Sequence, residues 1–325
     1  MSAQRCSVAC PGVFDDYEFA VCLTHDVDRV YKTYQSLYYA AAERRLYHLK
    51  TLLSGTEPYW QFAEIMALED RLGVRSSFYF LNEKHLLTDK SPTTWLRPTD
   101  WIRYTGHYEI GDPAIVDAIR ALDEGGWEVG LHGSYDSYAD PERLAWEKQE
   151  LEGVLGHQVT GGRQHFLNLD GPETWRHHRD VGLRYDASFG SSSTVGFDTP
   201  APVAGTGAEQ SATTVPERVG AGVFRPFDDD FLVFPLTVME APLVEEAGSV
   251  DAAWSKLRQL LADARRRQAV VTALWHPRLF NETEFPGYRR LYERLITEAK
   301  SLGAWVGPVE EAYHELVDHP GCTGA

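Results

Sequence analysis

The sequence has 325 residues, of which 43% are hydrophobic and 24% are charged. This is the composition of an ordinary globular protein, and the chain is long enough to bury a core without disulfides or a structural metal. Its 48 acidic and 31 basic residues give a net charge of −17, which argues against nucleic acid as a partner. No apolar run approaches the roughly 20 residues that a membrane helix needs, so no membrane insertion is expected. Residues 1–16 lack a signal-peptide pattern, which predicts a cytoplasmic protein.

Short apolar runs alternate with amphipathic segments along the chain. The apolar runs predict strands over residues 20–24, 75–81, 127–131, 159–163, 183–185, 231–236, 269–275 and 304–306. Helical spacing and capping residues predict helices over residues 59–72, 112–123, 140–155, 172–181, 250–266 and 286–302.

Strands that alternate with helices imply parallel strands joined by helical crossovers. Seven or eight such units fit a distorted, mostly parallel (β/α) barrel better than an open sheet. We expect residues 1–18 to be an N-terminal extension and residues 19–325 to be one barrel domain. Two long loops, near residues 82–111 and 190–222, interrupt the alternation, and loops of this length are usually lids or mobile segments.

Polar and titratable side chains follow five of the predicted strands at the point where each strand ends. They are Asp26 and Asp28, His132 and Asp136, Arg163 and His165, Asp186, and His276. In a parallel barrel the carboxyl ends of the strands meet on one rim, where catalytic groups are expected. The sequence therefore predicts a single site on that rim.

The first two clusters favour a metal site. Asp26 and Asp28 point the same way if the strand continues, and two carboxylates this close are best ionised together beside a cation. His132 and Asp136 share one face if a helical turn begins between them. Asp28, His132 and Asp136 would then offer one imidazole and two carboxylates to Zn²⁺, or to a harder ion such as Mn²⁺ or Fe²⁺. Taken singly, each residue is better explained as a loop charge, a structural histidine or a helix cap.

The later clusters suggest acid–base chemistry. His276, at the end of an apolar strand, is placed to act as a general acid. Arg163 could orient a carboxylate through a bidentate contact, and Asp186 could hold His276 in one tautomer. Surface salt bridges or a hydrogen-bonded loop histidine are the alternatives.

These clusters, in this order, resemble the polysaccharide deacetylase family, also called the NodB-homology domain or carbohydrate esterase family 4. The matching segments are THDVD at 24–28, HGSYD at 132–136, GGRQH at 161–165, YDAS at 185–188 and LWHP at 274–277. THDVD resembles the HDVD form of one bacterial and archaeal branch. The resemblance covers about residues 19–306.

The resemblance implies a distorted (β/α) barrel and metal-dependent removal of N-acetyl groups from sugars. It implies that Asp26 is the general base, held by Arg163, and that Asp28 and His132 bind one divalent metal. It also implies that Asp186 orients the general acid His276. Zn²⁺ is the first expectation, with Mn²⁺, Co²⁺ and Fe²⁺ as alternatives, because Asp136 stands where the family usually has a second histidine.

A further group of residues is expected to contact substrate. Tyr135 and Trp275 are aromatic side chains near the rim that could stack on a sugar, although core packing explains either one. Arg225 lies in a segment, FRPF, that also resembles this branch. His25 and His165 flank the predicted catalytic clusters.

The leading hypothesis is a metal-dependent deacetylase of an amino sugar, an oligosaccharide or a polysaccharide precursor. Hydrolysis of a non-carbohydrate amide or formamide would use the same groups with different loops. A glycan-binding barrel without activity is the third hypothesis, motivated by the change to Asp136. No GxSxG, GxGxxG or GxxxxGK[ST] motif is present, so neither a serine hydrolase nor a nucleotide cofactor is implied.

Overall fold

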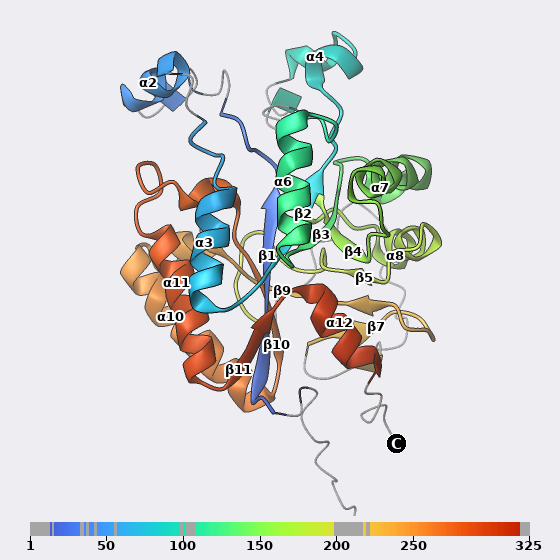
Figure 1. The fold of residues 1–325 in the computed structure, drawn as a ribbon, viewed down its shortest axis with the longest axis vertical. Helices are drawn as coiled ribbons and strands as arrows, with labels where there is room; N and C mark the ends of the chain where they lie inside the picture. The colour runs from blue at the N-terminus through green and yellow to red at the C-terminus, as the bar shows by residue number, and fades with distance from the viewer. Residues whose placement is uncertain are drawn as a thin grey trace, which may run out of the picture.

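A computed structural model gives the fold of this chain (Figure 1). It describes residues 14–318 except residue 15 and residues 33–35, 37–38, 42–43, 55–56, 98–99, 102–103, 105–107, 198–216 and 219–221. The predicted N-terminal extension and the predicted loop at 190–222 therefore lie largely outside the described residues.

The strands form one curled, mostly parallel sheet. They are β1 (Phe19–Val27), β2 (Ser77–Leu81), β3 (Glu128–Gly133), β4 (Gly161–Gln164), β5 (Tyr185–Asp186), β6 (Glu217–Arg218), β7 (Phe224–Arg225), β8 (Leu232–Val233), β9 (Leu236–Met239), β10 (Val270–Leu274) and β11 (Ala304–Gly307). Their order is β6-β7-β8-β5-β4-β3-β2-β1-β10-β9, and β11 also pairs with β1. A parallel bridge between Gly190 and Leu236 joins the chain after β5 to β9, at the other end of the sheet. The predicted distorted (β/α) barrel is thereby confirmed.

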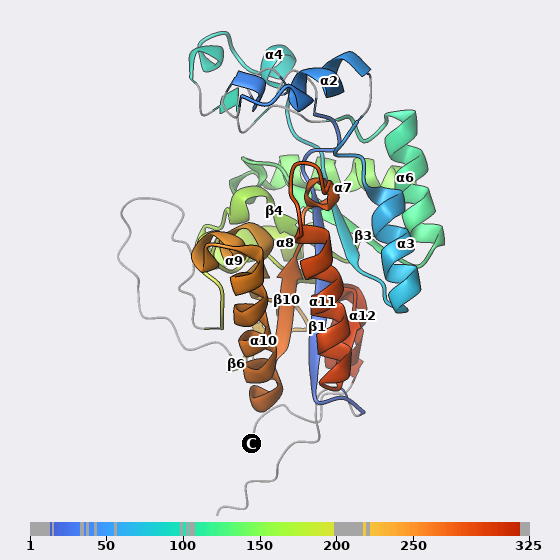
Figure 2. The same ribbon diagram turned by 90° about the vertical axis from the view of Figure 1, so that its left-hand side faces the viewer.

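Helices cover the outside of the sheet (Figures 1 and 2). The longer ones are α2 (Tyr47–Ser54), α3 (Phe62–Leu72), α6 (Pro113–Glu124), α7 (Pro141–Leu155), α8 (Gly171–Asp180), α9 (Glu240–Ala247), α10 (Val250–Arg267), α11 (Tyr288–Ser301) and α12 (Val309–Asp318). The short ones are α4 (Leu86–Asp89), η1 (Thr94–Leu96), η2 (Ser137–Ala139), η3 (His165–Leu167) and η4 (Pro277–Phe280). The predicted helices are all present, while α2, α4, α9 and α12 were not predicted.

The predicted strand at 231–236 is wrong in one respect, because it is two strands. β8 pairs with β5, whereas β9 pairs with β10. Pro235 lies between them and has no N–H to donate to a ladder, so the chain leaves one part of the sheet there and joins another. This break brings the end of β9 beside the end of β10.

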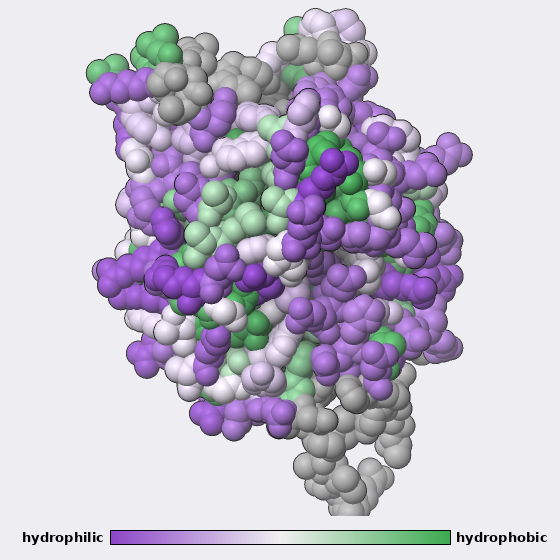
Figure 3. Space-filling view, in the orientation of Figure 1, coloured by the Kyte–Doolittle hydropathy of each residue, from purple (hydrophilic) through white to green (hydrophobic). Residues whose placement is uncertain are grey.

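The main core lies between the sheet and its helices. β1 is buried at every position, as expected of a central strand with neighbours on both sides. Hydrophilic side chains cover most of the face seen in Figure 3, with apolar side chains in separate patches. No helix among the described residues is both long and apolar enough to cross a bilayer.

The chain above the carboxyl ends of the strands carries α2 and α4, which both views place at that end of the molecule (Figures 1 and 2). The predicted loop at 82–111 contains α4 and η1. Trp95 donates from its indole to the Leu86 carbonyl at 2.7 Å, so the described part of this loop has internal structure.

Candidate active site

The last residues of β1 alternate between two environments, as the period of a strand requires. Thr24 and Asp26 face the interior of the barrel, where both accept hydrogen bonds from Arg163. His25 faces the helices instead and contacts Glu69 of α3 and Tyr292 of α11. This alternation places the aspartates together on the site side of the strand.

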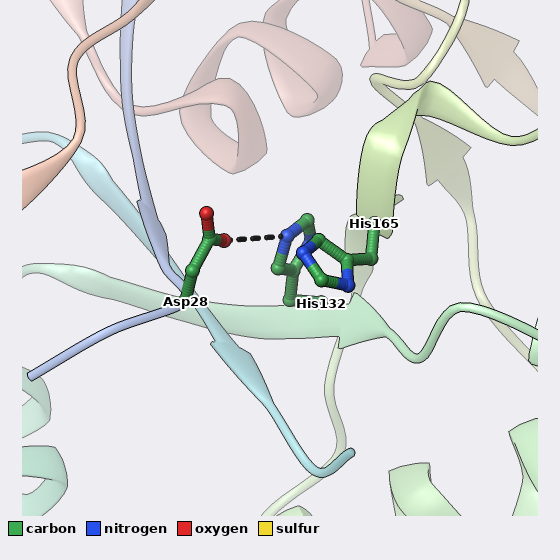
Figure 4. Close-up of side chains that lie close together, drawn as sticks. All are labelled: Asp28, His132 and His165. Atoms are coloured by element: carbon green, nitrogen blue, oxygen red, sulfur yellow. Dashed lines mark hydrogen bonds and ion pairs between the residues drawn. The ribbon is translucent and has the colours of Figure 1, made fainter. Parts of the chain in front are cut away.

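Three of the predicted site residues lie close enough together to bind one metal ion. Asp28, His132 and His165 each offer a ligand atom, and these atoms lie within 4.8 Å of one another. Figure 4 shows both imidazole rings beside the Asp28 carboxylate, with His132 Nε2 at 3.1 Å from Asp28 Oδ1. The residues come from the ends of β1, β3 and β4, and these chain segments are brought together by the sheet.

Neighbouring groups orient both histidines. His132 Nδ1 donates to the Arg163 carbonyl at 2.8 Å, which directs its Nε2 toward Asp28. His165 Nδ1 lies 3.6 Å from Glu83 Oε2. Glu83 is itself fixed by the backbone N–H groups of Tyr135 and Lys84, at 2.6 and 2.9 Å. Partners of this kind set the tautomer and direction of metal-binding histidines.

The electrostatics of the group favour a positive charge. Burial would raise the pKa of Asp28, but hydrogen bonds from His132 and His276 outweigh it and hold that pKa well below its usual range. Burial would lower the pKa of His132, yet the charges of Asp26 and Asp28 raise it. The two carboxylates therefore favour positive charge at this buried imidazole, and a divalent cation would be a chemically reasonable source of that charge.

Asp26 is held by a fully buried arginine. Arg163 Nη1 donates to Asp26 Oδ1 at 2.7 Å, and Arg163 Nε donates to the Ala187 carbonyl at 2.8 Å. Asp26 Oδ2 lies 3.8 Å from His132 Nε2. The carboxylate therefore borders the candidate metal site and is held in place by a buried arginine.

His276 borders the group on the β10 side. Its Nε2 lies 3.4 Å from Asp28 Oδ2, and its Nδ1 donates to Glu240 Oε1 at 2.5 Å. Burial lowers the pKa of His276, but the charge of buried Glu240 and the hydrogen bond with Asp28 outweigh it and raise that pKa to about 10. The imidazole is thus protonated at neutral pH, as a general acid must be.

Asp186 does not contact His276, contrary to the sequence expectation. It accepts from the indole of Trp175 at 3.1 Å and from the backbone of Ser188 at 3.0 Å, and it lies 3.3 Å from His178 Nδ1. The reason is strand order: β5 is separated from β10 by β4, β3, β2 and β1, whereas Glu240 directly follows β9, the neighbour of β10. Glu240 occupies the place expected of Asp186.

Asp136 also lies apart from the metal-binding group. Its exposed carboxylate is 3.0 Å from Lys90 Nζ in the loop above the barrel, and Tyr104 donates to it at 3.4 Å. The expected helical turn after His132 does not form, because β3 continues to Gly133 and a turn follows. The i to i+4 relation between His132 and Asp136 is therefore lost, and His165 offers the third ligand atom of the candidate metal site.

Three of the residues expected to contact substrate lie outside the candidate site. His25 and Trp275 are both fully buried, and His25 Nδ1 donates to the Trp275 carbonyl at 2.5 Å, so they belong to the core. Arg225 lies on β7 near Asp230, at 3.8 Å, and near Tyr313 of α12, away from the metal-binding group. These three expectations are corrected by burial and position.

Tyr135 lies at the edge of the site, within an aromatic group that includes Tyr104 and Phe166. Its ring packs edge-on against Tyr104 at 6.1 Å and against Phe166 at 5.6 Å. The Phe166 ring is 4.4 Å from the His165 ring and 48% exposed. Apolar ring faces thus border the metal-binding group.

Sequence analysis assigned His165 another role and did not identify Glu240. A signal for His165 as a ligand existed, because it lies two positions after Arg163 on a strand expected beside His132. No local signal identified Glu240, because its role depends on β9 lying next to β10.

Comparisons with known proteins were made for sequence and for structure. No protein-family model matches the sequence, and no curated protein is significantly similar to it. A candidate polysaccharide deacetylase from Mycobacterium smegmatis is similar in structure, with a TM-score of 0.57 and 16% identity over 94% of this chain and 93% of that one. This similarity shows that the chain has the polysaccharide deacetylase fold.

Two weaker similarities involve an enzyme and a pseudoenzyme. The chitin deacetylase of Colletotrichum lindemuthianum has a TM-score of 0.49 and 14% identity, over 91% of this chain and 88% of that one. A carbohydrate esterase family 4 pseudoenzyme from Bacillus anthracis has a TM-score of 0.46 and 11% identity, over 91% of this chain and 66% of that one.

Proposed function

We propose that this protein is a metal-dependent hydrolase that removes the N-acetyl group from an amino sugar, free or within an oligosaccharide or polysaccharide precursor. The observation that carries the proposal is the buried group of Asp28, His132 and His165, bordered by an arginine-held carboxylate and a glutamate-held histidine. The shared deacetylase fold supports the reaction type. The aromatic rings at the edge of the site suit the apolar faces of a sugar.

The donor set fits a divalent transition metal. Two imidazoles and one carboxylate are the ligands of many hydrolytic Zn²⁺ sites, which leave coordination positions open. When bound, such a cation would polarise the amide carbonyl and lower the pKa of a water molecule. His132 is already directed by its hydrogen bond to the Arg163 carbonyl, so this imidazole needs little reorganisation to bind a metal.

The remaining residues divide the proton transfers between them. Asp26, held by Arg163, would take the proton of the attacking water. His276 would give its proton to the departing sugar amine, and the Glu240 carboxylate stabilises the protonated imidazole until then. A base and an acid on different strands, both beside the metal-binding group, suit hydrolysis of an amide.

Metal content of purified variants tests the ligand assignment. We expect about one divalent ion per chain in the wild type and little or none in Asp28→Ala and His165→Ala, because each variant lacks a proposed ligand. Asp136→Ala is the matched control and should bind as the wild type does. Retention of metal by His165→Ala together with its loss from Asp136→Ala would overturn the ligand set.

Acetate release from a panel of substrates tests the reaction. N-acetylglucosamine and its β-1,4 oligomers should release acetate when metal is bound, and simple acetamides and formamides serve as comparison. Preferential hydrolysis of the simple amides would favour a non-carbohydrate amidohydrolase. A metal-loaded protein that binds the oligomers without acetate release would be a glycan-binding barrel.

A further inference from the structure

A fully buried carboxylate, Glu69 of α3, lies behind the candidate site and has no role in the proposed reaction. Its Oε2 accepts from Ser76 Oγ at 2.9 Å and from the Trp127 indole at 2.7 Å, and its Oε1 accepts from the Tyr292 hydroxyl at 2.6 Å. His25 Nε2 lies 3.0 Å from the same Oε1. Each oxygen thus has two partners, as a carboxylate away from water requires, and the Glu69 side chain is held in one position.

The imidazole of His25 is fixed from several sides. Its Nδ1 donates to the Trp275 carbonyl at 2.5 Å, and its Nε2 contacts Glu69. The centre of its ring lies 4.6 Å from that of Phe78 and 5.4 Å from that of Tyr292. The His25 side chain is fully buried, so it cannot turn away from the Trp275 carbonyl without leaving buried polar groups unpaired.

The Trp275 carbonyl belongs to the peptide group that leads into His276, between the end of β10 and the start of η4. The N–H of Trp275 donates to the Thr24 carbonyl at 2.9 Å, and His25 holds the carbonyl of the same residue. A peptide group is planar. These two hydrogen bonds therefore fix the direction in which the chain enters His276.

The hydrogen bond between His25 and Trp275 connects the strand of the proposed base to the strand of the proposed acid. His25 directly precedes Asp26, and Trp275 directly precedes His276. The His276 ring then reaches the site, where its Nε2 lies 3.4 Å from Asp28 Oδ2. A general acid acts only within hydrogen-bond reach of the leaving group, and a displacement of about 1 Å can lower a rate about 100-fold. The position of the His276 main chain relative to β1 consequently matters for proton transfer.

We propose that His25 is a positioning residue for His276. Its hydrogen bond to the Trp275 carbonyl sets the direction of the proposed general acid, and Glu69 holds the His25 ring in place. His25 acts through the main chain, because its ring faces the helices and not the interior of the barrel. The inference rests on the proposed function for the role of His276 as an acid.

Two substrates that differ in their need for an acid test this role. The amine released from an N-acetylglucosamine oligomer must take up a proton, whereas the nitrophenolate of 4-nitrophenyl acetate leaves without one. With metal bound, His25→Leu should lower kcat for the oligomer about 100-fold with little change in KM, since general acids contribute at least about this factor. Hydrolysis of 4-nitrophenyl acetate should stay near the wild-type rate, as it should in His276→Gln.

A conservative variant and a control accompany His25→Leu. In His25→Asn the amide nitrogen is bonded to Cγ, as Nδ1 is, so it can still donate to the Trp275 carbonyl and should recover most of the lost kcat. If His25→Leu does not fold, His25→Gln takes its place, because its amide lies one bond farther from the main chain. His157→Leu, at a histidine whose side chain is 54% exposed, should leave both rates unchanged.

Magnetic resonance tests the position of His276 without turnover. In the full-length protein labelled with ¹⁵N-histidine, the Nδ1 proton that His276 donates to Glu240 should give a downfield signal, assigned by its loss in His276→Gln. His25→Leu should shift or broaden this signal. His25→Asn and His157→Leu should leave it at the wild-type position.

An unchanged His276 signal in His25→Leu, or a loss of oligomer and ester hydrolysis by the same factor, would overturn the proposal. These outcomes are separable from that of the proposed function. If the metal-loaded wild type releases no acetate from any N-acetylated sugar, the function is overturned and the His276 signal still decides the role of His25. If the wild type releases acetate and His25→Leu equals it on both substrates, the function stands and the positioning role is wrong.

Discussion

At the residue scale, Arg163 links the two halves of the candidate site. Its guanidinium holds Asp26, and its carbonyl accepts from His132 Nδ1. One residue thereby fixes both the proposed base and a proposed metal ligand. Its full burial is compatible with its charge because Asp26 is the ion-pair partner at 2.7 Å.

Glu240 gives a test at the same scale. A general acid works below its pKa and loses activity above it, so the alkaline limb of the pH–rate profile reports His276. The Glu240 charge helps to raise the pKa of His276 to about 10. In Glu240→Gln that pKa falls, and we expect the alkaline limb to move to lower pH.

Asp186→Asn is the comparison for this experiment, because Asp186 contacts His178 and Trp175 and not His276. Its alkaline limb should stay where the wild type has it, with folding checked by circular dichroism. A limb that moves in Asp186→Asn and not in Glu240→Gln would return the orienting role to Asp186.

At the scale of elements, the two Asp-Pro helix caps predicted from the sequence differ in whether the aspartate side chain makes a capping hydrogen bond. Asp140 precedes Pro141 and accepts from the Arg143 backbone N–H at 3.0 Å, so it caps α7 directly. Asp112 precedes Pro113 in the same way, but its side chain makes no capping hydrogen bond to α6. The same Asp-Pro pattern is therefore expected to stabilise the two helices by different amounts.

This difference predicts unequal losses of stability. Asp140→Ala should lower the free energy of unfolding by about 1 kcal/mol, the usual value of an N-cap hydrogen bond. Asp112→Ala should lower it by less, and urea denaturation of the two variants measures the difference. Equal losses would mean that the capping hydrogen bond of Asp140 contributes little.

At the scale of the whole molecule, a buried carboxylate at the amino ends of the strands, away from the candidate site, ties helix α12 to the barrel. Glu128, at the start of β3, accepts from Ser77 Oγ at 2.6 Å, from the Glu310 backbone N–H at 2.9 Å and from the Tyr185 hydroxyl. These contacts attach the first turn of α12 to the barrel interior. Burial and the charge of Glu310 raise the pKa of Glu128 to about 7.

The raised pKa predicts how stability depends on pH. Between the ordinary value near 4.5 and about 7, the folded protein binds a proton that the unfolded chain releases. The free energy of unfolding therefore falls as pH rises through this window. Glu128→Gln should reduce the loss between pH 5 and pH 8, whereas Glu150→Gln, on an exposed face of α7, should not. An unchanged pH dependence in Glu128→Gln would show that Glu128 is not responsible.

The sequence by itself determined the barrel, because strand and helix periods are local properties and alternation implies parallel strands. It also determined that Asp26, Asp28, His132 and Arg163 lie on one rim, since each follows a strand and the carboxyl ends of parallel strands meet. Only the tertiary structure decided which residue offers the third ligand atom and which carboxylate contacts His276. His165 in place of Asp136 depends on where β3 stops and on the neighbouring position of β4. Glu240 in place of Asp186 depends on strand order. Side-chain direction is set within a few residues of the chain, whereas the choice between two carboxylates more than 50 positions apart is made by which strands lie side by side.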